Sequence, residues 1–130
     1  MTTVLLDTHV LHWWSAEPDR LSPDAAQALV GADELAVADV TWFELAWLAT
    51  HRRIVVGVPI RSWLEGLAGQ VRTVGVTPAI ADTAVSLPKS FPGDPADRLI
   101  YATAVELGWR LVTRDHRLHE HLHPTAITIW

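Results

Sequence analysis

The sequence predicts one α/β domain, in which helices cover both faces of a mostly parallel central sheet of about five strands. Three observations predict this doubly wound class. Short apolar or β-branched runs alternate with segments of helical pattern along the chain. Several helical segments begin with a capping residue followed by proline, which marks their boundaries. The length of 130 residues suits one hydrophobic core, so the domain is expected to span residues 1–130.

Strands are expected where apolar or β-branched residues form short runs between turn or capping residues. The five runs cover residues 3–6, 35–38, 71–76, 111–113 and 126–130. A helical segment follows each of the first four. Because parallel strands need a crossover between them, this alternation favours a parallel sheet.

Three of the intervening helices begin with a capping residue and a proline, a pattern that suits the free N–H groups of a first turn. The pairs are Ser22-Pro23, Thr77-Pro78 and Asp94-Pro95. The helix that begins at Ser22-Pro23 is expected to end near residue 31, and the helix that begins at Thr77-Pro78 is expected to end near residue 87. The helix after Asp94-Pro95 is expected to cover residues 96–107. The last helix is apolar on most sides before Gly108 ends it, so we expect it to be central.

The other helical segments have different signals. Residues 9–15 follow the first strand and Asp7, residues 59–69 form a further segment, and Asp115 caps a short turn. Thr41-x-x-Glu44 has the spacing of a capping box and predicts a helix to about residue 53. Residues 88–93 are expected to form a loop.

Four acids are expected to share one edge of the sheet. Asp7, the segment 39–44 with Glu44, and Asp115 each come after a predicted strand, where parallel sheets bind ligands. Asp97 opens the helix that leads into the fourth strand. Capping explains each acid singly, but converging carboxylates repel one another unless a cation is present. Capping and metal binding are compatible.

Composition narrows the chemistry. The chain has no Cys, which excludes disulfides, thiol nucleophiles and thiolate metal sites, so oxygen ligands point to Mg²⁺, with Mn²⁺ as a substitute. Carboxylate-bound Mg²⁺ activates water and clamps phosphate, which indicates a phosphodiester substrate. The net charge of −5 does not exclude a nuclease, because four of the 15 acids would belong to the metal site. Phosphate-binding loop motifs for nucleoside triphosphates and dinucleotides are absent from the sequence.

The apolar stretches are too short to cross a bilayer and the N-terminus lacks a basic leader, so a cytoplasmic protein with no membrane partner is expected.

Four segments, in this order, resemble PIN-domain proteins and specifically the VapC-like toxins of type II toxin-antitoxin pairs. They are LLDTHVLHWW (residues 5–14), VTWFELA (40–46), GDPADRLIYATA (93–104) and LVTRD (111–115). The resemblance implies a Mg²⁺-dependent endoribonuclease that hydrolyses RNA with metal-activated water. It places the catalytic, metal-binding acids at Asp7, Glu44, Asp97 and Asp115. It also implies a homodimer and a cognate antitoxin that inserts a basic side chain, often Arg, into the acidic groove.

Three further residues are candidates for supporting roles. Asp94 is expected to cap its helix, with a role behind the metal ligands as the alternative. Arg98 either pairs with a site acid or contacts a phosphate, or it is an ordinary solvated arginine. Thr113 either orients an acid or a metal-bound water, or it simply ends its strand. The family often carries His-Arg ahead of the Asp-Pro pair, whereas Phe91-Pro92-Gly93 stand here.

Two other functions remain open from the sequence. One is a metal-independent ribonuclease in which His9 and His12 act with a C-terminal histidine as general acid and base. The other is a PIN-fold module that binds RNA or a protein partner without turnover. The C-terminal histidines are expected to be exposed polar residues rather than a metal site, namely His116, His119, His121 and His123. Most of the seven Trp residues are expected in the core, with one or two on a partner surface.

Overall fold

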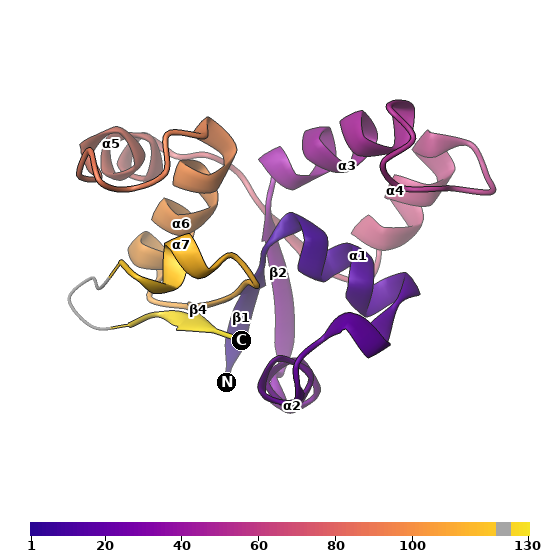
Figure 1. Cartoon of the computed structure of the whole chain (residues 1–130), viewed down its shortest axis with the longest axis horizontal. Helices are drawn as coiled ribbons and strands as arrows, with labels where there is room; N and C mark the ends of the chain where they lie inside the picture. The colour runs from indigo at the N-terminus through magenta and orange to yellow at the C-terminus, as the bar shows by residue number, and fades with distance from the viewer. Residues whose placement is uncertain (122–125) are drawn as a thin grey trace.

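The computed structural model describes residues 1–121 and 126–130, and its centre is a five-stranded sheet (Figure 1). The strand order is β3-β2-β1-β4-β5, and every neighbouring pair is parallel. The strands are β1 (Thr3–Leu6), β2 (Glu34–Ala38), β3 (Arg72–Val74), β4 (Arg110–Val112) and β5 (Thr128–Ile129). The predicted fold class is confirmed, and the sheet is wholly rather than mostly parallel.

Seven α-helices and one short 3₁₀ helix connect the strands within the described residues. They are α1 (Thr8–Ala16), η1 (Pro18–Arg20), α2 (Pro23–Gly31), α3 (Val40–Thr50), α4 (Ile60–Ala68), α5 (Pro78–Ser86), α6 (Pro95–Leu107) and α7 (His116–His119). The three predicted caps are confirmed, because the side chains of Ser22, Thr77 and Asp94 each accept a hydrogen bond from the backbone N–H three residues later. Gly108 ends α6 in the left-handed conformation, at φ 68°.

Alternating strand residues build a hydrophobic cluster on each face of the sheet. Val4 and Leu6 pack with residues of α1, α2 and α4, whereas Leu5 packs with Ile100 and Tyr101 of α6. Figure 1 shows the same division, with α5, α6 and α7 on one side of β1 and β2 and α1, α3 and α4 on the other. Each fully buried leucine contributes about 2 kcal/mol. As predicted, α6 is central, with five successive buried residues from Ile100 to Ala104.

The strand register brings the carboxyl ends of the central strands to one edge. Leu6 of β1 pairs with Val112 of β4, and the backbone N–H of Asp7 donates to the Val112 carbonyl at 3.0 Å. Leu5 pairs with Ala36 of β2, so β2 also ends on this edge. The residues that follow β1, β2 and β4 are therefore neighbours in space.

Some predicted boundaries are wrong. The helix α3 begins at Val40 and ends at Thr50, and no capping box forms between Thr41 and Glu44. The reason is a tertiary contact, because both side chains approach the Thr8 hydroxyl instead. The third and fifth strands are shorter than expected, since only residues 72–74 and 128–129 pair with a neighbouring strand. Within the described ranges, no helix has the length and hydropathy that a bilayer crossing requires.

Candidate active site

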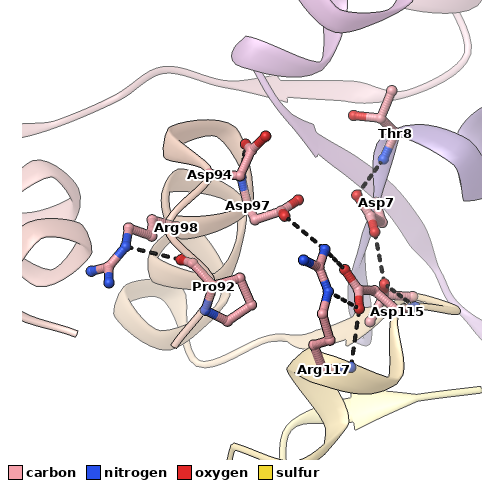
Figure 2. A network of polar contacts seen from close by, with 9 residues as sticks. Asp7, Thr8, Pro92, Asp94, Asp97, Arg98, Asp115 and Arg117 are labelled. Carbon is pink, nitrogen blue, oxygen red and sulfur yellow. Dashed lines mark hydrogen bonds and ion pairs between the residues drawn. The ribbon is translucent and has the colours of Figure 1, made fainter. Parts of the chain in front are cut away.

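The structure brings all four predicted acids to one pocket of about 650 Å³. They come from different elements: Asp7 follows β1, Glu44 lies on α3, Asp97 lies on α6, and Asp115 precedes α7. Figure 2 shows Asp7, Asp97 and Asp115 directed toward a common space. Residues around them complete the wall of the pocket, namely Thr8, His9, Val10, Trp13, Asp94, Arg114, His116 and Arg117.

Asp7 is fixed through both carboxylate oxygens. Its Oδ1 accepts a hydrogen bond from the Thr8 backbone N–H at 2.7 Å, which caps α1 as predicted. Its Oδ2 accepts a hydrogen bond from the hydroxyl of Thr113 at 2.7 Å. Burial nevertheless raises the pKa of Asp7, because loss of solvation outweighs these hydrogen bonds. Thr113 therefore contacts a site acid, which corresponds to one of the roles expected for it.

Glu44 is held by a second threonine. The buried Thr8 hydroxyl donates to Oε1 of Glu44, and the hydroxyl of Thr41 lies 3.2 Å from that of Thr8. Burial raises the pKa of Glu44, and the charge of Asp7 adds to the rise. The side chain that sequence rules assign to a helix cap thus belongs to the pocket.

The surroundings of Asp97 make it a much weaker acid than usual. Burial and the surrounding carboxylates, first Asp7 and Asp94, raise the pKa of Asp97 to about 7. Its backbone N–H donates to Asp94 Oδ1 at 3.1 Å, so Asp94 acts as the predicted cap of α6. The first turn of α6 therefore presents Asp97 to the pocket at a fixed position.

Asp115 differs from the other three acids because it has an arginine partner. Its Oδ1 accepts from the backbone N–H and from Nε of Arg117, both at 3.0 Å, and its Oδ2 accepts from Nη2 at 2.6 Å. These contacts lower the pKa of Asp115. Nη2 of Arg117 also lies 3.5 Å from Oδ2 of Asp97, so one guanidinium bridges two site acids (Figure 2).

Sequence reasoning missed Arg117. The available signal was its place two residues after Asp115 at the start of a short helix, but that spacing does not specify where a long side chain points. Arg114 was also missed. It lines the same pocket with its guanidinium carbon 5.8 Å from the centre of the Trp13 ring.

Contact with a site acid was one of the alternatives for Arg98, and the structure does not show it. Its guanidinium turns away from the acids and donates to backbone carbonyls (Figure 2), at distances of 3.0–3.4 Å. The acceptors are Ala84, Leu87, Pro88, Phe91 and Pro92. Successive residues of a helix differ by about 100° in direction, so Asp97 and Arg98 face different surroundings.

His9 and His12 do not meet in the pocket as the alternative histidine mechanism would require. His9 lines the pocket, but Nε2 of His12 lies 3.2 Å from Glu17 and the His12 ring packs against Trp63, outside the pocket lining. His116 also lines the pocket, whereas Nε2 of His119 lies 2.6 Å from the carbonyl oxygen of Thr113. His123 lies outside the described residues.

The donor set fits a hard divalent cation. Its side chains offer only carboxylate and hydroxyl oxygens, and three of the four acids have a raised pKa, which a bound cation would lower. Among residues 1–121 and 126–130, no three histidine or acidic side chains are already arranged as ligands of one ion. The guanidinium of Arg117 provides a positive charge beside Asp97 and Asp115.

Comparison with known proteins identifies the family. Residues 4–121 match the PIN domain family. Ribonuclease VapC22 of Mycobacterium tuberculosis (strain ATCC 25618 / H37Rv) is 67% identical over 130 residues, which is 100% of both chains. Among solved structures, VapBC2 from Rickettsia felis, bound to a promoter DNA fragment, has a TM-score of 0.71 at 15% identity and covers 98% of this chain and 97% of that one. A toxin-antitoxin complex from Klebsiella pneumoniae has a TM-score of 0.64 at 23% identity and covers 86% of each chain. The two structures support the fold, and the family match together with the full-length relative shows that this chain belongs to the PIN-domain family as a VapC-like member.

Proposed function

We propose that the protein is a Mg²⁺-dependent endoribonuclease that acts as the toxin of a toxin-antitoxin pair. The observation that carries the proposal is the convergence of four acids from four different elements in one pocket. Three of these acids have a pKa raised by burial, so their ionised forms need a cation. The 67% identity to a protein named Ribonuclease VapC22 supports the nuclease class.

In this proposal Asp7, Glu44, Asp97 and Asp115 hold the metal, and Mn²⁺ substitutes for Mg²⁺. Bound Mg²⁺ supplies a lower pKa for the attacking water and positive charge for the phosphodiester. The hydroxyls of Thr113 and Thr8 keep two of the carboxylates in fixed orientations. Asp94 supports the site indirectly, because it caps the helix turn that presents Asp97.

The expected partners are RNA, an antitoxin and a second copy of the chain. The similar solved structures include toxin-antitoxin complexes, and an acidic pocket is a suitable receptor for a basic antitoxin side chain. Exposed aromatic residues lie beside this pocket on α3, where Phe43 is 71% exposed and Trp47 is 44% exposed. We propose that this surface is covered in the homodimer or in the antitoxin complex, and that the protein acts in the cytoplasm.

The first test measures metal binding by thermal unfolding of the wild type and Asp7→Asn with Mg²⁺, with Mn²⁺ and with EDTA. Asn caps a helix about as well as Asp, so this change removes the charge and keeps the cap. Metal is expected to raise the wild-type midpoint and to raise that of Asp7→Asn less. Asp82→Asn, at an exposed position of α5, is the matched control and should respond like the wild type.

The second test measures cleavage of total cellular RNA and the chemistry of the new ends. We expect cleavage with Mg²⁺, 5′-phosphate and 3′-hydroxyl ends, and loss of at least about 100-fold in Asp97→Asn, which removes a charge from the metal site. Cleavage that persists in EDTA and leaves a cyclic phosphate would favour the histidine mechanism. RNA binding without cleavage, unchanged in Asp97→Asn, would favour a binding module.

A further inference from the structure

Arg117 is the side chain whose contacts the proposed reaction does not yet explain. Within the described residues, its side-chain hydrogen bonds all go to carboxylate oxygens, namely both oxygens of Asp115 and Oδ2 of Asp97. The side chain is nevertheless 58% exposed, whereas those of Asp97 and Asp115 are 18% and 21% exposed. The exposed guanidinium of Arg117 thus lies against Asp97 and Asp115, the two acids that line the pocket beside it.

These contacts use the oxygens that a metal would need. Both oxygens of Asp115 accept hydrogen bonds from the Arg117 side chain, so a divalent cation held by Asp115 must share an oxygen with the guanidinium, whereas at Asp97 only Oδ2 accepts from Arg117. Two cations cannot share these oxygens without strong repulsion. Binding of the metal therefore requires the guanidinium to leave at least part of its present position.

The released guanidinium would stay in the pocket. Arg117 lies in the first turn of α7, and its backbone N–H remains tied to Asp115 Oδ1. Its flexible side chain is exposed to solvent and lines the same pocket as the acids. Guanidinium has a planar array of donors that matches two oxygens of a phosphate, and such charge-assisted pairs are strong.

We propose that Arg117 alternates between two anionic partners: the carboxylates of Asp97 and Asp115 before the metal binds, and a phosphate of the RNA afterwards. This inference rests on the proposed function and adds a substrate-binding residue to it. Arg117 competes with the metal in the first state and holds the substrate in the second. Removing it should therefore have opposite effects on metal binding and on RNA binding.

Calorimetric titration with Mn²⁺ alone tests the first state. Arg117→Gln is expected to bind Mn²⁺ about tenfold more tightly than the wild type, which corresponds to about 1.4 kcal/mol. Arg114→Gln is the matched control, because it removes the same charge from the same pocket but Arg114 lies over Trp13 rather than on an acid. An equal gain in both variants would mean that only the general charge of the pocket matters, and would overturn the competition.

Fluorescence anisotropy with a labelled, mixed-sequence single-stranded oligoribonucleotide tests the second state, with Ca²⁺ in place of Mg²⁺ to limit cleavage. Arg117→Gln is expected to weaken RNA binding by about fivefold or more, and Arg117→Lys by less, because Lys keeps the charge without the paired donors. Weaker binding of both metal and RNA would show a structural role. Tighter binding of both metal and RNA would show that Arg117 only inhibits binding and does not hold the substrate.

These outcomes separate the inference from the proposed function. If the wild type binds no Mn²⁺, the metal-dependent function fails. If the wild type binds Mn²⁺ and Arg117→Gln binds Mn²⁺ and RNA as the wild type does, only the role of Arg117 fails. Circular dichroism of each variant checks that the fold is retained.

Discussion

The two halves of the acidic pocket hold their carboxylates by different means. In the hydroxyl half, Asp7 and Glu44 accept hydrogen bonds from the buried, neutral side chains of Thr113 and Thr8. In the arginine half, Asp97 and Asp115 share one exposed guanidinium. The first half is therefore fixed in geometry without a compensating charge, whereas the second is neutralised in part by a side chain that is exposed to solvent.

The difference shows how one pocket can orient some of its carboxylates rigidly while others keep a partner that can be exchanged. Neutral donors orient a carboxylate without competing for its charge, so a cation that binds in the hydroxyl half displaces no other positive charge. A guanidinium competes for that charge, so the arginine half must exchange partners. The buried hydrogen bonds of the first half are consequently expected to contribute more to the free energy of unfolding than the exposed ion pairs of the second.

The largest effect is expected from Thr113→Val. This change removes the hydroxyl that donates to Asp7 and accepts from the backbone N–H of Asp115 at 3.1 Å, which leaves buried polar atoms without partners. We expect a loss of about 1–3 kcal/mol in the free energy of unfolding, measured with urea. Thr103→Val is the control, because that equally buried hydroxyl donates only to the Leu99 carbonyl of its own helix. Equal losses in the two variants would remove the special role of Thr113.

A smaller effect is expected from Asp97→Asn in metal-free protein. The pKa of Asp97 is raised from 3.8 to about 7, so between these pH values the folded state binds more protons than the unfolded state. Stability must then fall as pH rises through this window. Asp97→Asn removes that contribution and should gain about 1–2 kcal/mol relative to wild type between pH 5 and pH 8, because solvent at this partly exposed side chain reduces the full effect. Urea unfolding in EDTA at both pH values measures it, and a parallel pH dependence in the two proteins would contradict it.

The smallest effect is expected from Asp115→Asn. Asn keeps the cap of α7, and the lost ion pair involves an arginine that is 58% exposed, so the cost should stay below about 1 kcal/mol. The cost should shrink further in 1 M NaCl, where charges are screened within about 3 Å. The cost of Thr113→Val should not change with salt. A large, salt-independent cost for Asp115→Asn would remove the distinction between the two halves.

Local rules predicted the elements and most of the pocket. Asp7 and Asp94 cap their helices as expected, because a cap depends on neighbours in the chain. The convergence of Asp97 with Asp7 was predictable as well, since a helix that leads into a parallel strand begins at the edge where the neighbouring strands end. These predictions needed only spacing and topology.

The failures have one physical cause, which is that tertiary contacts select where polar side chains point. Glu44 has the spacing of a capping box with Thr41, but Thr8 from another helix provides a buried donor and takes its carboxylate. Arg98 and Arg117 are both exposed cations in a sequence-based view. One donates to carbonyls and the other to carboxylates, and chain spacing does not distinguish these acceptors.

The contacts of Arg98 have a consequence for how this protein can vary. Its five acceptors are all main-chain carbonyls of residues 84–92, and two of them belong to prolines, which lack an N–H of their own. A carbonyl is the same whatever side chain its residue carries, so the exposed positions Lys89 and Ser90 are free to diverge among relatives. Phe91 is not, because its ring packs 4.9 Å from that of Tyr101. Substitutions should therefore accumulate in this loop while its length stays constant, because an insertion would move the carbonyls away from the guanidinium.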